Sequence, residues 1–170
     1  MRILMILRAG PVARPSRPLG LNHVVEAYYI LQDAGTEVVI ASSPNGAPRI
    51  RAARNGSARA TSSIQRFLND RNARDAFSDT LKLEQIYSED FDGAICINAL
   101  EEPAESADAE AVLSLLKALL AAGKPVAIVP NEPEFVSLGS FKGLLIIGNG
   151  VRAPSLAAKA ILGALNQHPG

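Results

Sequence analysis

The chain has 170 residues, 48% of them apolar, which suits one domain spanning residues 1–170 with a full hydrophobic core. Lys and Arg together number 17, as do Asp and Glu, and this zero formal charge argues against partners such as nucleic acid or an anionic membrane. One cysteine and two histidines exclude an internal disulfide, a Cys-rich metal site and a His-rich site within one chain. The apolar run at residues 3–7 is too short for a signal peptide or a membrane span, so we expect a cytoplasmic protein.

Short apolar runs alternate with helical patterns along the chain. The apolar runs predict buried strands at 2–7, 36–41, 91–97, 125–129 and 144–147. Helical periodicity predicts helices at 21–34, 63–77, 79–87, 106–122 and 155–165. Ser106 and Ser155 are the expected N-caps of the last two helices. Residues 43–62 form a polar excursion rich in Gly, Pro and Arg.

This alternation predicts an α/β fold with a mainly parallel sheet and helices on both faces, in a flavodoxin-like, doubly wound layout. Ligands in such folds bind beyond the carboxyl ends of the strands. The segments to examine for a site are therefore 8–20, 97–103, 130–133 and 148–154.

One segment matches a nucleotide-binding pattern. Residues 148–153 read G-x-G-x-x-A, in which glycines let the backbone approach a pyrophosphate at a helix start. The match follows the last strand, and only 17 residues remain after Ala153, too few for the strand that carries the ribose-binding carboxylate. We therefore interpret it as a tight strand-to-helix turn and expect no cofactor and no metal.

An Arg-rich segment spans residues 49–74. It holds seven arginines, with Asp70 as its one acidic residue and Phe67 as its one aromatic residue. An anion or nucleic-acid patch is one interpretation, but base stacking needs interleaved aromatic residues. A solvated face is favoured, and no nucleic-acid partner is expected.

Two further features involve residue types that often take part in catalysis. Cys96 lies inside an apolar strand, a setting typical of an inert, buried thiol rather than a nucleophile. His23 and Glu26 are one helical turn apart near the start of the first helix, so they are able to share a face. This pair is either an acid–base pair or a surface pair near a helix start, and the second interpretation is favoured.

Several segments in order resemble the ThiJ/PfpI family of the class I glutamine amidotransferase-like superfamily. The matching pieces are YYILQDAGTEVVIASSPNG, FDGAI, GKPVAI, KGLLIIGNG and the closing AAKAILGAL, at residues 28–46, 91–95, 123–128, 142–150 and 157–165. The resemblance covers nearly the whole chain. It implies a flavodoxin-like fold and a homodimer.

The resemblance also locates the family's site, and each part of it is altered here. His23 stands where the family has a helix-borne glutamate, with Glu26 three residues on. The nucleophile elbow, C-H-G-P or C-A-G-P in the family, is Pro130, Asn131 and Glu132 followed by proline. The glycine pair that helps form the oxyanion hole is replaced by Asn98 and Ala99.

These replacements predict the loss of thiol chemistry, because proline has no nucleophile, no N–H and no access to the strained backbone that the resemblance implies for the elbow. The leading hypothesis is a pseudoenzyme that binds a small molecule or a partner protein in a remnant pocket around residues 23, 98 and 131. One alternative is an enzyme of non-Cys mechanism, of hydrolase or lyase type, with His23 or Glu26 as the acid or base. Another is a structural or regulatory subunit with no small-molecule site.

Overall fold

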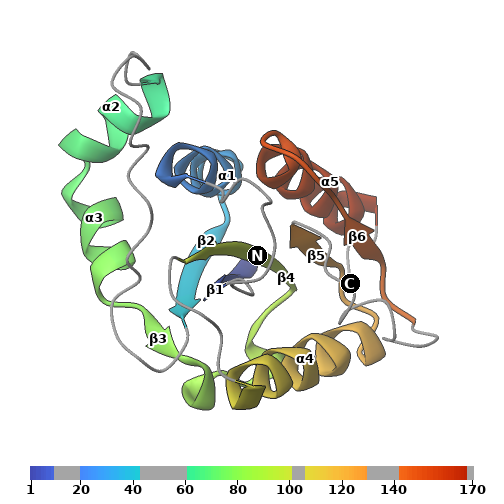
Figure 1. Ribbon diagram of the computed structural model, residues 1–170. Helices are drawn as coiled ribbons and strands as arrows, with labels where there is room; N and C mark the ends of the chain where they lie inside the picture. The colour runs from blue at the N-terminus through green and yellow to red at the C-terminus, as the bar shows by residue number, and fades with distance from the viewer. Residues whose placement is uncertain (10–19, 43–60, 101–105, 130–141, 168–170) are drawn as a thin grey trace.

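The computed structural model describes residues 1–9, 20–42, 61–100, 106–129 and 142–167, in which strands alternate with helices (Figure 1). The strands are β1 Arg2–Ala9, β2 Glu37–Ser42, β3 Leu81–Lys82, β4 Gly93–Leu100, β5 Val126–Val129 and β6 Leu145–Ile147. The α-helices are α1 Leu21–Asp33, α2 Ser62–Asn69, α3 Arg71–Ser78, α4 Ser106–Ala121 and α5 Ala153–Gln167. Two 3₁₀ turns, η1 Leu83–Gln85 and η2 Ser88–Asp90, precede β4.

The strands form one sheet in the order β3-β2-β1-β4-β5-β6, and every pairing in it is parallel. Without the two-residue edge strand β3, this is the flavodoxin-like order, with the first strand between the second and third long strands. The predicted flavodoxin-like α/β fold is thus confirmed. The direction of winding reverses between β1 and β4, which makes the carboxyl ends of these two strands the expected place for a ligand.

Helices cover both faces of the sheet, with α1 and α5 on one face and α4 on the other (Figure 1). Along β1, Ile3, Met5 and Leu7 belong to the core cluster beneath α1 and α5. Leu4 and Ile6 belong to the second cluster, beneath α4. Burial on both faces explains why the strand is apolar throughout rather than alternating.

The predicted helix at 63–77 is in fact two helices, α2 and α3, separated at Asp70. This residue has an extended backbone (φ −94°, ψ 99°), and its Oδ1 accepts a hydrogen bond of 3.0 Å from the N–H of Ala73. A single carboxylate therefore ends one helix and caps the next, which periodicity alone does not reveal.

The predicted helix at 79–87 is wrong. Leu81 and Lys82 instead form the edge strand β3, paired in register with Ala41 and Ser42 of β2, and a 3₁₀ turn follows. Leu83 is buried in the cluster beneath α4, and Ile86 packs against that cluster. Their i, i+3 spacing imitates a helical pattern although only one 3₁₀ turn forms.

Helix α5 begins at Ala153, two residues before the predicted start. Ser155 does not cap it, because its hydroxyl donates a hydrogen bond of 3.0 Å to the backbone carbonyl of Arg152. Pro154 fits the first turn, where its missing N–H has no helical partner to lose. Among the helices of the described residues, none has both the length and the hydropathy needed to cross a membrane.

Candidate functional site

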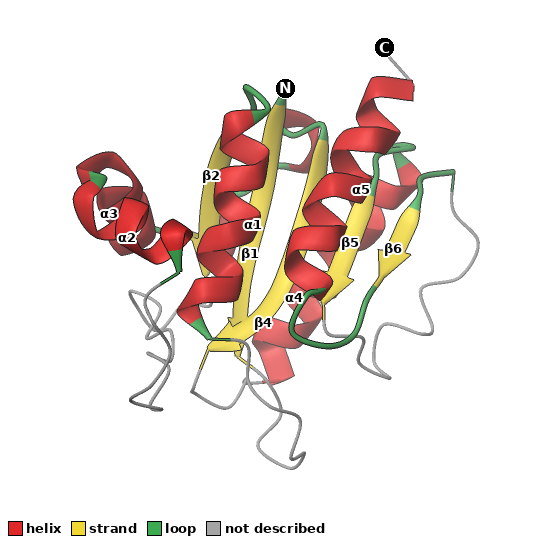
Figure 2. Cartoon of the chain, turned by 90° about the horizontal axis from the view of Figure 1, so that it is seen from above, coloured by secondary structure: helices red, strands yellow, loops and turns green. Residues whose placement is uncertain are grey.

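The carboxyl ends of β1, β4 and β5 and the start of α1 meet at one edge of the sheet (Figure 2). This arrangement follows from the parallel strands, because each helix runs back along the sheet before the next strand begins. The edge carries the candidate residues on α1 and β4. Pro130, Asn131 and Glu132, which follow β5 in the sequence, lie outside the described residues.

His23 lies in the first turn of α1 and is half-buried. Its Nδ1 is fully buried and has no hydrogen-bond partner among the described residues. Burial lowers the pKa of His23 below its usual value of 6.5, and the nearby Glu26 carboxylate partly opposes this shift. The ring is therefore neutral at physiological pH and has a buried nitrogen available to a hydrogen-bond partner.

Glu26 is exposed on α1, one turn after His23. The Glu26 carboxylate lies close enough to favour the charged form of His23, but no hydrogen bond joins the two side chains. The pair thus has the proximity that its spacing predicts, without the direct contact that proton transfer between the two groups needs.

Strand β4 has an irregularity at the second pair of candidate residues. Arg8 of β1 is in register with Asn98, whereas Ala9 is in register with Leu100, and Ala99 is left as the extra residue. Such a bulge redirects backbone groups, and bulges are frequent beside binding and active sites. The structure thus places the backbone irregularity at the two residues that the sequence analysis singled out in β4.

Cys96 lies two residues before this irregularity, in the middle of the sheet. Its register partners are Ile6 of β1 and Ile128 of β5, and the residue is 2% exposed. It belongs to the core cluster beneath α4. The prediction of a buried thiol is confirmed.

The glycine pattern at 148–153 forms the tight turn from β6 to α5. Gly150 has φ +91°, a conformation that favours glycine. A Cβ on Gly148 would lie 3.0 Å from Val129 Cγ1 and 3.1 Å from Ala153 Cβ, so this position needs a residue without a side chain. Both glycines have a structural reason that requires no nucleotide.

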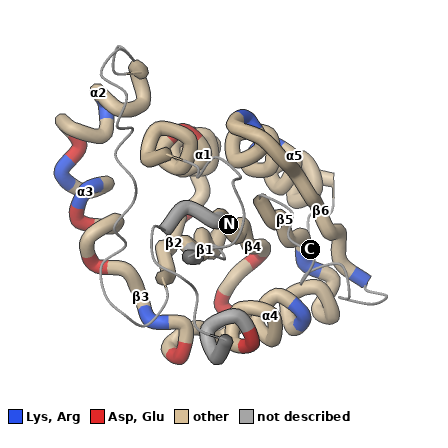
Figure 3. Tube along the Cα trace, in the orientation of Figure 1, with Lys and Arg blue, Asp and Glu red and all other residues tan. Residues whose placement is uncertain are grey.

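The described part of the Arg-rich segment lies on α2 and α3, and these two helices together carry acidic as well as basic residues (Figure 3). Arg66 makes two hydrogen bonds of 2.8 Å to the carboxylate of Asp33, and this pairing lowers the pKa of Asp33. Arg71 approaches Asp75 at 3.5 Å with both side chains exposed. Of this segment, Arg49, Arg51, Arg54 and Arg59 lie outside the described residues.

Sequence reasoning missed a polar cluster that joins α2 and α3 to α1. The guanidinium of Arg66 lies 3.9 Å from the ring centroid of Tyr29. The Tyr29 hydroxyl donates a hydrogen bond of 3.1 Å to Asp70 Oδ2. Burial and the contact with Asp70 raise the pKa of Tyr29 to about 12. These contacts cross about 40 residues of sequence (|i−j| 41 for Tyr29 and Asp70), and no local pattern signals them.

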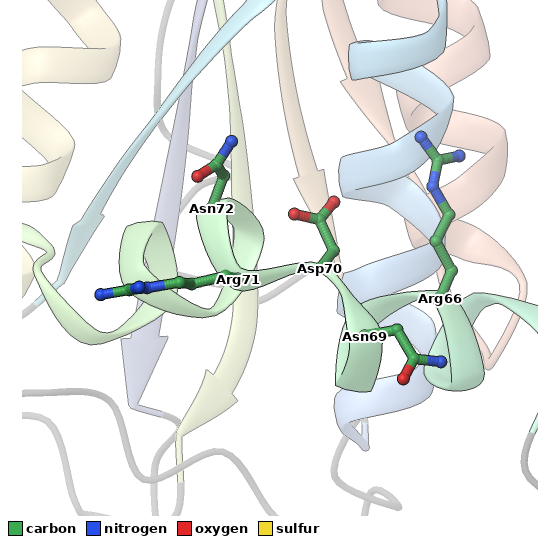
Figure 4. A pocket seen from close by; sticks show the side chains of 5 residues that line it. All are labelled: Arg66, Asn69, Asp70, Arg71 and Asn72. Carbon is green, nitrogen blue, oxygen red and sulfur yellow. The ribbon is translucent and has the colours of Figure 1, made fainter.

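An open hollow of about 460 Å³ lies beside this cluster, lined by Arg66, Asn69, Asp70, Arg71 and Asn72 (Figure 4). The polar side chains at its centre already take part in hydrogen bonds within the protein. Both oxygens of Asp70 accept hydrogen bonds, from Tyr29 and Ala73, and Asn69 Nδ2 donates one of 3.0 Å to the Gln65 carbonyl. The hollow is therefore better explained as the polar junction of two helices than as a catalytic pocket. Among the described residues, no group of three or more His, Cys, Asp or Glu side chains is placed to hold a metal ion.

No known family model matches the chain, and no curated protein matches it in sequence. Solved structures do match. The Rapid Encystment Protein 24 KDa of Francisella tularensis superposes with a TM-score of 0.69 at 16% identity, over 96% of this chain and 98% of that one. The chain has the same fold. A two-domain protein from Anabaena variabilis with dj-1/thij/pfpi-like and ferritin-like domains has a TM-score of 0.57 at 13% identity, over 98% of this chain and 50% of that one.

The similar structures also include an isoprenoid biosynthesis protein with an amidotransferase-like domain from Ehrlichia chaffeensis. It has a TM-score of 0.51 at 9% identity, over 96% of this chain and 98% of that one. The structural neighbours are thus DJ-1/ThiJ/PfpI-like and amidotransferase-like proteins. At these identities the likeness is one of fold.

Proposed function

We propose that this chain is a pseudoenzyme related to the DJ-1/ThiJ/PfpI-like proteins, which binds a small molecule or a partner protein at the carboxyl edge of its sheet. The observation that carries the proposal is the location of its single thiol. Cys96 is buried in the middle of β4, between β1 and β5. A nucleophilic thiol needs access to its substrate and an electropositive setting, and Cys96 has neither open access nor a position at the strand ends.

The family resemblance supports the same conclusion from the sequence. Pro130 aligns with the family's nucleophile, directly after Val129, the last residue of β5. Proline supplies no thiolate and no backbone N–H. A chain with a buried cysteine and a proline at the elbow has no group able to form a thioester.

Two features of the described residues favour binding at this edge. The bulge at Ala99 lies next to β1, at the point where the winding of the sheet reverses. The buried Nδ1 of His23 has no partner among the described residues, and an unsatisfied buried nitrogen is costly. A ligand that supplies this hydrogen bond would recover that cost, so we expect it to contact the first turn of α1.

An enzyme of non-Cys mechanism is the second candidate, and one observation favours it. Burial lowers the pKa of His23, so the imidazole is neutral and able to accept a proton at physiological pH. Glu26 remains a weaker candidate because it is exposed and makes no hydrogen bond to His23.

Turnover measurements separate the two candidates. The substrates are methylglyoxal, glutamine and a peptide amide, and the proteins are the wild type, Cys96→Ala and His23→Gln. The pseudoenzyme proposal expects no turnover above the buffer rate in any of them. Activity lost in Cys96→Ala would refute the proposal, and activity kept in Cys96→Ala but lost in His23→Gln would establish the second candidate.

Ligand binding is tested by thermal unfolding with a panel of small 2-oxo aldehydes, carboxylates and amides. A ligand at 100 times its Kd adds about 2.7 kcal/mol, which raises the Tm of a domain of this size by roughly 5–10 °C. His23→Ala should reduce that shift, and Lys117→Gln, an exposed change on α4 away from this edge of the sheet, should retain it. If no compound shifts the Tm, or if His23→Ala responds like the wild type, the proposed small-molecule site is wrong.

A further inference from the structure

The outer edge of β6 leaves backbone hydrogen-bonding groups without partners among the described residues. Val126 N–H donates to the Leu144 carbonyl at 2.8 Å, and Gly148 N–H donates to the Ile128 carbonyl at 3.2 Å. In a parallel ladder the backbone groups of alternate residues bond to the same neighbouring strand, so the N–H and C=O groups of the ladder at residues 144, 146 and 148 point toward β5. The N–H and C=O groups of Leu145 and Ile147 therefore point away from the sheet. No other described strand pairs with β6.

Exposed apolar side chains lie on β6 and on the turn and helix that follow it. Leu144 is 52% exposed and Ile147 is 45% exposed on β6 and its approach. Val151 in the following turn is 50% exposed, and Leu156 in the first part of α5 is 60% exposed. We call these four residues, together with the outward backbone groups of β6, the β6 edge surface.

Among the described residues from 142 to 167, which contain the β6 edge surface, every charged side chain is positive. From Lys142 to Gln167 the sequence contains no Asp or Glu, and its three charged residues are Lys142, Arg152 and Lys159. All three are exposed, and none has an acidic partner among the described residues. Figure 3 shows no acidic segment on β6 or α5. This is a local excess of positive charge in a chain whose formal charge is zero.

We propose that the β6 edge surface docks an extended segment of a partner protein, which adds a strand beside β6 and alternates acidic with apolar residues. Strand addition supplies main-chain hydrogen bonds to residues 145 and 147, and alternate side chains of the segment cover Ile147 on one face and Leu156 on the other. The acidic residues pair with the three cations at the rim. Unlike protected edge strands, β6 contains no Lys, no Pro and no bulge.

A second copy of this chain fits the surface less well. A twofold pairing through β6 presents the same patch on both subunits, so the cations of one copy would face those of the other. No acidic residue between 142 and 167 is present to offset that repulsion. Charge complementarity therefore selects an acidic partner over self-association.

Fluorescence anisotropy with three labelled heptapeptides tests this proposal on the whole chain. The probe is EIEVEIE, and the two matched controls are KIKVKIK, which reverses the charge, and ESESESE, which removes the apolar residues. We expect saturable binding of EIEVEIE, at least about tenfold tighter than either control and weakened by salt as the rim charges are screened. Absence of saturable binding of EIEVEIE, or equal binding of the three peptides, would overturn the proposal.

Variants of the chain locate the peptide. Ile147→Pro removes one outward N–H and leaves the ladder to β5 intact, and Arg152→Glu with Lys159→Glu reverses the rim charge without touching the strand. Each should weaken binding at least about tenfold, whereas Lys117→Glu, an exposed change on α4, should leave it unchanged. Unchanged binding in the charge-reversed variant would refute the assignment. A wild-type dimer that Ile147→Pro dissociates would also refute it, because the occupant would then be a second copy.

Discussion

The reactivity of Cys96 tests directly whether the fold protects the only thiol of the chain from reagents in solution. The side chain lies under α4 among Leu4, Ile6, Leu116 and Ile128 of the same core cluster. Strand β4 is flanked by β1 and β5, so neither side of Cys96 is an edge. A reagent reaches the sulfur only when this central part of the sheet opens, and such openings cost nearly the full free energy of unfolding.

The expected slowing follows from that free energy. A domain of ordinary stability unfolds with about 5 kcal/mol or more, which corresponds to an open fraction of about 1 in 5,000 or less. Native Cys96 should therefore react at least about 10³-fold more slowly than the same thiol in denaturant.

The assay follows the absorbance released by a disulfide reagent at neutral pH, with and without urea. The matched control is Cys96→Ala combined with Ser114→Cys, which places one thiol at an exposed position of α4 and should react within seconds. Stoichiometric labelling of the native wild type at the control's rate would refute the reasoning. It would also remove the main support for a chain without thiol chemistry.

Three further predictions concern the site and the fold. Pro130→Cys should remain inactive in kcat/KM beside Pro130→Ala, because one substitution restores neither base nor oxyanion hole, and turnover by the Cys variant alone would contradict this. Gly143→Ala should lower the free energy of unfolding in urea by roughly 2–4 kcal/mol, since its Cβ would collide with the Lys124 carbonyl oxygen. Gly163→Ala has open space around the new Cβ in α5 and should instead raise the free energy of unfolding by about 1 kcal/mol. If both variants were less stable than the wild type, this expected difference between the two glycines would be refuted. The pKa of Tyr29 is raised from 10.0 to about 12 in the folded chain. The contribution of Tyr29 to the free energy of unfolding is therefore fully present below pH 10 and is lost as the pH rises toward 12. Tyr29→Phe should lack that part of the loss in unfolding curves, and identical pH profiles would contradict it.

Most of the sheet is predictable from the sequence because its strands are buried on both faces. Residues 3–7 of β1 are all fully buried, so the sequence shows an uninterrupted apolar run of the length typical of a central strand. Strand β3 is the opposite case. Leu81 and Lys82 are both exposed, and their pairing depends on β2, which lies about 40 residues earlier in the sequence (Ala41 pairs with Leu81). No local pattern encodes such a contact.

The candidate site likewise has features that a local sequence pattern predicts and features that depend on contacts between distant segments. The position of His23 in the first turn of α1 follows from the local helical pattern. The extra residue at Ala99 does not, because a bulge is a property of how β4 aligns with β1. The joining of α2 to α1 through Arg66 and Asp33 is likewise invisible to a pattern in which the arginines indicate only a solvated face.

Helix α1 packs against α5 on one side and α2 on the other, and six of its side chains are buried: Val24, Val25, Ala27, Tyr28, Tyr29 and Leu31. Moving this helix would require repacking much of that core, and close-packed interiors resist such shifts. The backbone at residue 23 is therefore held in place by the packing of these buried side chains. Substitution at position 23 changes which group is presented at the strand ends, while the place where it is presented stays fixed. This architecture is therefore able to present different side chains at the same place beside the strand ends.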